Sequence, residues 1–392
     1  MTAKIIERIG NHGPHRILAL DGGGVRGIIS IAFLEEIEAT LASRAVELGK
    51  VKQASDFRLS QYFDLIGGTS AGSILAVLLA LGWRVADIRE KFEAWAPGIF
   101  RRPWYKLPLF SPKFNARTLQ NFIVDVLGDM ELGSDKFQTV VAVIAKRLDT
   151  GSSWVLTNSP FSKYWDENAD TGTIGNKAYK LVDVIRASTA APYYFAPRKI
   201  QISANQAGLF ADGGVSPHNT PALQLLMLAG MRGYKFGWDL GADKLLIVSV
   251  GTGLCRFRIT KTLLNRLVPR LFAVDCLQGL ITDGQQLSLK LLQWMSTPRR
   301  PWKIDGEVGT LENDELFAAI GVNRPMLSFV RYDIRLERDW LLRELDKVMS
   351  DSSLEYHRAF DQPANIPLNY DLAKRAAKIQ VTADDFPEIF DT

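Results

Sequence analysis

The sequence contains few of the residues that form disulfides or bind metal ions. It has two cysteines, Cys255 and Cys276, and four histidines among 392 residues. Two cysteines cannot make a disulfide framework or a four-ligand zinc site, so we expect a reducing compartment. An acidic loop of the EF-hand type is also missing. We therefore expect neither a metal ion nor a cofactor.

The chain also lacks a strong excess of charge. Lys and Arg number 47 and Asp and Glu number 43, which leaves a net charge of +4. This small excess does not predict a nucleic acid polymer as a partner. The hydrophobic content of 47% excludes a disordered or low-complexity protein. The length fits two to three domains, or one large α/β domain with additions.

Neither a membrane-spanning segment nor a signal peptide is predicted. Residues Leu65–Trp83 carry no charge, and a run of that length would suit a transmembrane helix. Its first half, however, is crowded with small residues, namely Gly67, Gly68, Thr69, Ser70, Gly72 and Ser73. Two shorter elements joined by a tight turn explain the run better. Residues 1–15 have no continuous apolar core and no small-residue cleavage site, so we expect a soluble, cytoplasmic protein.

Short apolar runs alternate with helical periodicity along most of the chain. Strands are predicted at residues 16–20, 62–66, 139–145 and 244–250, and helices at 28–41, 71–81, 181–188 and 221–228. Near-continuous apolar strands that alternate with helices are typical of a parallel sheet covered on both faces, an α/β fold. Past about residue 290 the alternation fades, and we expect a mostly helical C-terminal extension. The predicted division is a domain at 1–290 with an extension at 291–392 packed on it.

The strongest local motif is Gly68-Thr69-Ser70-Ala71-Gly72, which satisfies G-x-S-x-G. This pattern is typical of a strand that turns sharply into a helix and places the serine at the apex. The flanking glycines are needed because a Cβ on either side would collide with the neighbouring element. The start of the following helix favours the negative charge that develops during acyl transfer. Ser70 is therefore the candidate nucleophile, with Gly68 and Gly72 in support.

A glycine loop at residues 21–27, Asp-Gly-Gly-Gly-Val-Arg-Gly, also lies between a predicted strand and a predicted helix. Consecutive glycines expose backbone N–H groups to an anionic oxygen. The loop has neither the Gly-Lys-Ser/Thr ending of a P-loop nor the G-x-G-x-x-G spacing of a dinucleotide fold. Because a serine elbow follows, an oxyanion hole made by Gly22, Gly23 and Gly24 is a better interpretation than a nucleotide-phosphate loop. Arg26 would hold the loop or contact a phosphate.

A serine nucleophile needs a base, and Asp212 is the candidate. It ends an apolar run and is followed by Gly213 and Gly214, which places a carboxylate at a predicted strand end. A lone aspartate near a turn is usually a turn former. The order Ser, Asp, His of the α/β-hydrolases also permits a triad with His218 or His357. The residues alone leave the choice between a dyad and a triad open.

Four sequence blocks, taken together, resemble the patatin-like phospholipases. Three are the glycine loop at 21–27, the serine motif at 68–72 and Asp-Gly-Gly at 212–214. The fourth, Ala-Ser-Thr-Ala-Ala-Pro-Tyr-Tyr-Phe at 187–195, is similar to the family's A-S-x-A-x-P-x-x-F segment. The blocks occur in the family's order, and no catalytic position departs from its pattern. Residues beyond about 255 match nothing in that pattern.

The resemblance implies a three-layer fold with a parallel-rich central sheet sandwiched by helices. It also implies a Ser–Asp dyad, in which Asp212 is the base for Ser70. The expected reaction is attack by Ser70 on a fatty-acyl ester carbonyl of a phospholipid, formation of an acyl-enzyme, and hydrolysis by water activated by Asp212. A free aspartate has a pKa near 3.9 and is a poor base. Burial must therefore raise the pKa of Asp212, and oxyanion stabilisation must supply much of the rate.

A lipid hydrolase must meet a phospholipid membrane surface, and one acid-free stretch suits that contact. Residues 94–124 include Arg101, Arg102, Trp104 and Tyr105, which combine cations that attract anionic lipid with aromatics that favour the headgroup level. The alternative is a solvated loop with partly buried aromatics. A second acid-free stretch, 255–274, is more simply explained by helix packing. We expect peripheral membrane association when the protein is active.

Two further hypotheses concern ligands and assembly. A regulatory module that binds a phosphate-bearing ligand without turnover is the alternative class of function, and the intact Ser70 and Asp212 disfavour it. Some bacterial patatin-like enzymes in anti-phage defence are switched on by cyclic dinucleotides, and the size and plan of this chain are similar to theirs. A cyclic dinucleotide activator is thus an implied partner, although no residue identifies its site. A homo-oligomer is a candidate assembly that the sequence does not test.

Overall fold

A computed structural model describes residues 3–102, 111–255, 269–304, 309–311 and 324–391. The strands of this described part are β1 (His15–Leu20), β2 (Leu65–Thr69), β3 (Val140–Arg147), β4 (Ser153–Thr157), β5 (Arg198–Ser203), β6 (Gln206–Asp212), β7 (Gly241–Val250), β8 (Ser296–Pro298) and β9 (Leu327–Tyr332). Its α-helices are α1 (Ala3–Gly10), α2 (Gly27–Glu47), α3 (Leu59–Tyr62), α4 (Ala71–Ala80), α5 (Val85–Ile99), α6 (Ala116–Leu127), α7 (Leu181–Ser188), α8 (Ala222–Gly230), α10 (Pro269–Met295), α11 (Arg338–Leu345), α12 (Asp351–Arg358) and α13 (Ile366–Gln380).

All the described strands belong to one sheet, in the order β5-β6-β3-β2-β1-β7-β9-β8, with β4 also paired to β3. The pairs β3–β2, β2–β1, β1–β7, β7–β9 and β9–β8 are parallel, whereas β4 and β6 run antiparallel to β3. Parallel strands end at the same edge of a sheet, so the loops that follow β1, β2 and β7 meet there. The predicted parallel-rich α/β sheet is therefore confirmed.

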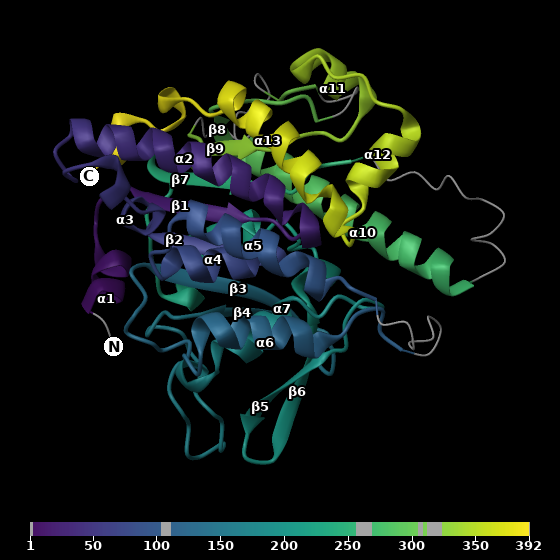
Figure 1. The fold of residues 1–392 in the computed structure, drawn as a ribbon. Coiled ribbons are helices and arrows are strands. Elements are labelled where there is room, and N and C mark those ends of the chain that lie inside the picture. Colours follow the sequence, from purple (N-terminus) through teal and green to yellow (C-terminus); the bar gives the residue numbers. More distant parts are fainter. Residues whose placement is uncertain (1–2, 103–110, 256–268, 305–308, 312–323, 392) are drawn as a thin grey trace.

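Helices cover both faces of the sheet, which gives three layers. Successive residues of a strand point to opposite faces. A side-chain carbon at Gly67 of β2 would lie 2.5 Å from Leu225 of α8, whereas one at Gly68 would lie 2.0 Å from the carbonyl oxygen of Gly72 in α4. Helices α8 and α4 thus lie on opposite faces, with α10 beside α8 and with α13 and α5 packed on α2. Figure 1 shows α2, α4, α5 and α13 together in front of the sheet.

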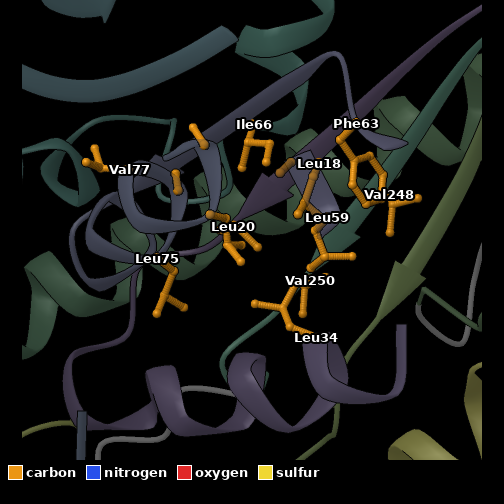
Figure 2. Packing of buried hydrophobic residues seen from close by; sticks show 14 of the residues in the cluster. Leu18, Leu20, Leu34, Leu59, Phe63, Ile66, Leu75, Val77, Val248 and Val250 are labelled. Atoms are coloured by element: carbon orange, nitrogen blue, oxygen red, sulfur yellow. The ribbon is translucent and has the colours of Figure 1, made fainter. Parts of the chain in front are cut away.

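The core lies between the central strands and these helices. Leu18 and Leu20 of β1 and Val248 and Val250 of β7 are fully buried, as is Leu34 of α2. Figure 2 shows them within one cluster of apolar side chains. Each such side chain stabilises the fold by about 1.5–3 kcal/mol relative to exposure. The strands that carry the glycine loop and the serine motif are therefore among the most firmly held parts of the protein.

The predicted strand at 62–66 is wrong in its position. Residues Leu59–Tyr62 form the short helix α3, in which the side chain of Gln61 accepts the backbone N–H of Arg58 at 2.7 Å. The strand β2 begins only at Leu65 and runs through Gly67 and Gly68 to Thr69. Gly67 and Gly68 therefore belong to the strand and not to a turn. Because they have no side chains, helices can approach both faces of the strand at this point.

The segment after residue 290 is mostly helical, as predicted, and it also contributes strands. Helices α11, α12 and α13 make up much of it, but β9 pairs with β7 inside the central sheet. The predicted boundary at residue 290 falls within α10. In the described ranges, no helix combines the length and the apolar character needed to cross a bilayer.

Candidate active site

Ser70 lies at a strained corner between β2 and α4. Its backbone has φ 54° and ψ −125°, a conformation that residues other than glycine rarely adopt. Such strain costs about 1–3 kcal/mol and persists only where the surroundings impose it. Here the Ser70 N–H donates to Ser188 Oγ at 2.9 Å, and Ser188 Oγ donates to the carbonyl of Ile144 at 2.6 Å. The end of α7 thereby fastens the corner to strand β3.

The glycines of the serine motif allow a close crossing of backbones. A Cβ at Gly68 would lie 2.0 Å from the carbonyl oxygen of Gly72. A Cβ at Gly72 would lie 2.3 Å from the carbonyl oxygen of Leu20 in β1. The corner at Ser70 is thus pressed directly against the end of β1, where the glycine loop begins. Both predicted supporting glycines are required by this approach.

Asp212 ends strand β6 and faces Ser70. Ser70 Oγ donates a hydrogen bond of 2.6 Å to Asp212 Oδ2, although the residues are 142 positions apart. The N–H of Gly214 donates to Asp212 Oδ1 at 2.7 Å, and Gly213 lies against strand β3. Burial raises the pKa of Asp212 to about 6, opposed by the hydrogen bonds from Ser70 and Gly214 and by the positive charge of Arg186. The carboxyl group is therefore a stronger base than an exposed aspartate.

Neither candidate histidine partners Ser70 in the described structure. The backbone carbonyl of His218 accepts a hydrogen bond from the hydroxyl of Thr69 at 2.6 Å. Burial lowers the pKa of the His218 imidazole. His357 lies in α12, where its Nδ1 is 2.7 Å from Asn369 Oδ1. The geometry therefore pairs the serine hydroxyl with a carboxylate rather than with an imidazole.

The N–H groups of the glycine loop differ in their hydrogen bonds, and the oxyanion hole of Gly22, Gly23 and Gly24 stays a prediction. The N–H of Gly22 donates to the carbonyl of Asn219 at 3.0 Å. The N–H groups of Gly23 and Gly24 donate no backbone hydrogen bond to any of the described residues. Gly24 has φ +58°, which its lack of a side chain permits. Gly22 anchors the loop, and its carbonyl accepts Thr252 Oγ1 at 2.9 Å.

Arg26 contributes to the shape of the loop. Its Nη1 donates to the carbonyl of Gly253 at 3.1 Å, after the end of β7, and the side chain lines the cavity in front of Ser70. This bond ties the glycine loop to the turn that follows β7. Asn219 and Thr252 were not predicted from the sequence. The Gly-Thr-Gly turn at 251–253, directly after a predicted strand, is the signal that would have found Thr252.

The predicted membrane-contacting residues fall at the border of the described structure. Arg101 and Arg102 are exposed after the end of α5. Trp104 and Tyr105 lie outside the described residues, as does most of the second acid-free stretch, 255–274. Among the residues that are described, no group of three or more His, Cys, Asp or Glu side chains is arranged to hold a metal ion.

A cavity of about 1100 Å³ opens in front of Ser70 and Asp212. Its polar part includes these two side chains, the glycine loop and Asn219, and also charged residues of the C-terminal segment such as Glu337, Arg338 and Asp351. Its apolar part is lined from α4, α5 and α6 by Ile74, Leu75, Leu78, Ile88, Phe92, Trp95, Ile99, Leu119 and Phe122. A cleft that joins an apolar wall to converging polar groups is typical of a small-molecule site. The size and lining suit a molecule with a long apolar part and a reactive polar group.

Comparison with known proteins identifies several similar sequences. A cGAMP-activated phospholipase of Escherichia coli is 31% identical over 255 residues, which cover 64% of this chain and 65% of that protein. A cGAMP-activated phospholipase of Vibrio cholerae is 32% identical over 216 residues, or 52% of this chain and 55% of that protein. Patatin-15 of Solanum tuberosum is 27% identical over 253 residues, or 60% of each chain. The matched region thus spans less than two thirds of the length of each relative.

The sequence profile of the family described as patatin-like phospholipase matches residues 18–226. This range runs from β1 to α8 and contains the glycine loop, the corner at Ser70 and Asp212. It covers more than half of the 392 residues. The chain therefore belongs to the patatin-like phospholipase family.

Proposed function

We propose that the protein is a serine acyl hydrolase that cleaves fatty-acyl ester bonds of membrane phospholipids. The observation that carries the proposal is the hydrogen bond of 2.6 Å from Ser70 Oγ to the buried Asp212 carboxylate. It opens into a cavity of about 1100 Å³ that has an apolar wall built from α4, α5 and α6. The names of the relatives as phospholipases support the same reaction class.

In the proposed mechanism, Asp212 takes the proton of Ser70 as Oγ attacks the ester carbonyl. The new C–O bond gives a tetrahedral oxyanion, which the N–H groups of Gly23 and Gly24 stabilise. The protonated Asp212 then gives its proton to the leaving alkoxide, and an acyl-enzyme on Ser70 remains. Water enters, loses a proton to Asp212 and attacks the acyl carbonyl, and the same proton returns to Ser70 Oγ. The raised pKa of Asp212, about 6, suits it to both steps.

The experiment measures fatty-acid release from phospholipid vesicles by the wild type and by Ser70→Ala and Asp212→Ala. We expect both variants to lose at least about 10³-fold in rate, because each lacks a group that moves a proton or forms the acyl bond. His218→Ala and His357→Ala are the controls, and the dyad requires both to keep substantial activity. Near-complete loss in a folded His218→Ala would support a triad instead.

A fluorophosphonate probe distinguishes this hydrolase from a module that binds a phosphate-bearing ligand without turnover. The probe forms a covalent bond only with an activated serine, so we expect labelling at Ser70 in the wild type and none in Ser70→Ala. An unlabelled wild type with full affinity for phosphate-bearing ligands would favour the binding module.

We also propose that a cyclic dinucleotide activates the protein and that the active form binds the membrane peripherally. Two relatives at 31% and 32% identity are named cGAMP-activated phospholipases, which supports the activator. The exposed Arg101 and Arg102 suit an anionic bilayer. Vesicle hydrolysis with and without a panel of cyclic dinucleotides tests the activator, and a response to none of them removes it. Co-sedimentation with anionic vesicles, compared with Arg101→Ala/Arg102→Ala, tests the membrane contact.

A further inference from the structure

A buried ion pair lies beneath the glycine loop and involves a residue far outside the matched family region. Asp21, the first residue of the loop, is fully buried. Its Oδ2 accepts Thr220 Oγ1 at 2.9 Å, Gln285 Nε2 at 2.7 Å and Arg331 Nη2 at 2.6 Å. Arg331 lies on β9 and is 310 positions away in the sequence. The segment after residue 290 thus places a cation against the first residue of the loop.

The sheet topology explains how Arg331 reaches Asp21. Strand β7 separates β9 from β1, and Arg331 is in register with Ser249 of β7. Arg331 Nη1 donates to Ser249 Oγ at 2.7 Å, and Nη2 donates to both Asp21 and Asp333, the latter at 2.7 Å. The guanidinium therefore passes over one strand and binds groups on three consecutive strand ends. Such a forked arrangement suits arginine, because a lysine ammonium is a single point charge.

The position of Asp21 determines the position of the loop and of the serine corner. The N–H of Asp21 donates to the carbonyl of Val250 at 3.1 Å, and Gly22 follows directly. A Cβ at Gly72 would lie 2.7 Å from the Asp21 carbonyl, so the backbone of Asp21 touches the first turn of α4. A change in the backbone dihedral angles of Asp21 would therefore move the N–H groups of Gly23 and Gly24 relative to Ser70.

We propose that Arg331, through its ion pair with Asp21, is a positioning residue that aims the N–H groups of the glycine loop at the oxyanion. The inference rests on the function proposed above and extends it to a residue of the C-terminal segment. Arg331 does not line the cavity, so it acts through Asp21 and not on the substrate. Buried charges need a partner, and removal of the partner leaves Asp21 free to turn away or to take a proton.

The test uses Arg331→Lys, which keeps the charge, and Asp21→Asn, which keeps the shape of the side chain. We expect kcat for a soluble p-nitrophenyl ester to fall about tenfold in each, with KM within about twofold, because only the transition state develops the oxyanion. Labelling of Ser70 by a fluorophosphonate should slow by a similar factor. Arg331→Met should lose about a hundredfold. The matched control is Arg300→Met. It removes the ion pair between Arg300 and Asp385, two residues of the same C-terminal segment.

Circular dichroism and thermal unfolding identify the variants that fold, and each folded variant decides the outcome. A folded Arg331→Lys or Asp21→Asn with wild-type kcat and labelling would overturn the proposal. So would a rise in KM at unchanged kcat, or a loss no larger than that of Arg300→Met. If the wild type neither labels at Ser70 nor cleaves the ester, the proposed hydrolase function fails instead. The two failures are therefore distinct.

Discussion

At the scale of single residues, the protonation of Asp212 is the property with the widest consequences. The carboxyl group is buried beside Ser70, and burial raises its pKa to about 6 from the ordinary value of 3.8. The proposed base is therefore protonated in mildly acidic solution and ionised at neutral pH. Both catalysis and stability should respond to this single group.

We predict that kcat/KM for a soluble ester falls about tenfold per pH unit below about pH 6 and is level above it, because only the ionised Asp212 accepts the serine proton. A pH–rate profile of the wild type measures this. An imidazole would titrate in a similar range, so His218→Ala is the control and should keep the same break. A profile that is flat from pH 5 to pH 8 would contradict the assignment of Asp212 as the base.

We also predict that Asp212→Asn is more stable than the wild type at pH 7. Between about pH 4 and pH 6 the folded protein keeps a proton that the unfolded chain has released, so stability falls as pH rises through this window. Above pH 6, the burial of ionised Asp212 lowers the free energy of unfolding by about 3 kcal/mol, and asparagine at this position has no charge to bury. Urea unfolding at pH 7.5 and pH 4 measures the difference, which should disappear at the lower pH. Asp170→Asn, in an exposed turn, is the control for a change of charge at the surface.

The roles of single residues were only partly predictable from the sequence. Ser70 and Asp212 were candidates because each follows an apolar strand and is flanked by glycines. Ser188 belonged to a recognised block, but its bond to the N–H of Ser70 requires that α7 and β2 meet in space. The same holds for Asn219, whose carbonyl occupies the N–H of Gly22. Such partners come from distant elements, and local patterns do not encode them.

At the scale of elements, the glycine loop lies between the end of β1 and the segment after α12 and is in contact with both. The N–H of Val25 donates to the carbonyl of Phe360 at 2.8 Å. The ring of Phe360 packs against Tyr194 with ring centres 4.7 Å apart. Lys113 and Asp361 form an ion pair in the same region. The C-terminal segment therefore touches both the loop and the block at 187–195.

We predict that Gly24→Ala destabilises the protein more than Gly49→Ala does. Both positions have positive φ, so each alanine suffers backbone strain of about 1–2 kcal/mol. Only at Gly24 would the new Cβ meet a neighbour, the carbonyl oxygen of Phe360 at 2.2 Å. This overpacking adds about 1–3 kcal/mol. Urea unfolding of the two variants measures the difference. Equal losses would show that the Phe360 carbonyl moves away from the new Cβ at little energetic cost.

The strand β9 shows why the prediction of a mostly helical segment beyond residue 290 omitted a strand. Residues 327–332 are apolar apart from Ser328 and Arg331, and all are buried. A charge inside a short apolar run argues against a buried strand, and its counter-ion Asp21 is 310 positions away. The partner strand β7 also lies far along the chain. Local periodicity therefore predicted β1, β3 and β7 well and did not predict β9.

At the scale of the whole molecule, the C-terminal residues are tied to the first strand. Arg16 of β1 donates to the carbonyl of Phe390 at 2.8 Å and pairs with Asp64 at 3.0 Å. Phe386 and Phe390 are both fully buried. The N-terminal and C-terminal parts thus share one hydrophobic core. The predicted division into a domain at 1–290 and an extension at 291–392 packed on it stays a prediction.

We predict that Phe390→Ala lowers the free energy of unfolding by about 3–5 kcal/mol, as expected for removal of a buried aromatic side chain. Ile389→Ala is the neighbouring control, because Ile389 is 46% exposed and should change stability by no more than about 0.5 kcal/mol. Chemical denaturation of both variants gives the two values. A loss shared equally by the two positions would mean that the C-terminal turn does not belong to the core.

The late position of β9 in the sequence has a consequence for how the protein is made. A ribosome delivers the chain from its N-terminus, and domains begin to fold as they emerge. Until residues 327–332 appear, β7 has an open side, and Asp21 has no arginine to face. A nascent chain can therefore hold a complete Ser70–Asp212 pair while its glycine loop is still unsupported. On the proposed mechanism, lipid-cleaving capacity is withheld during translation until the last parallel strands are in place.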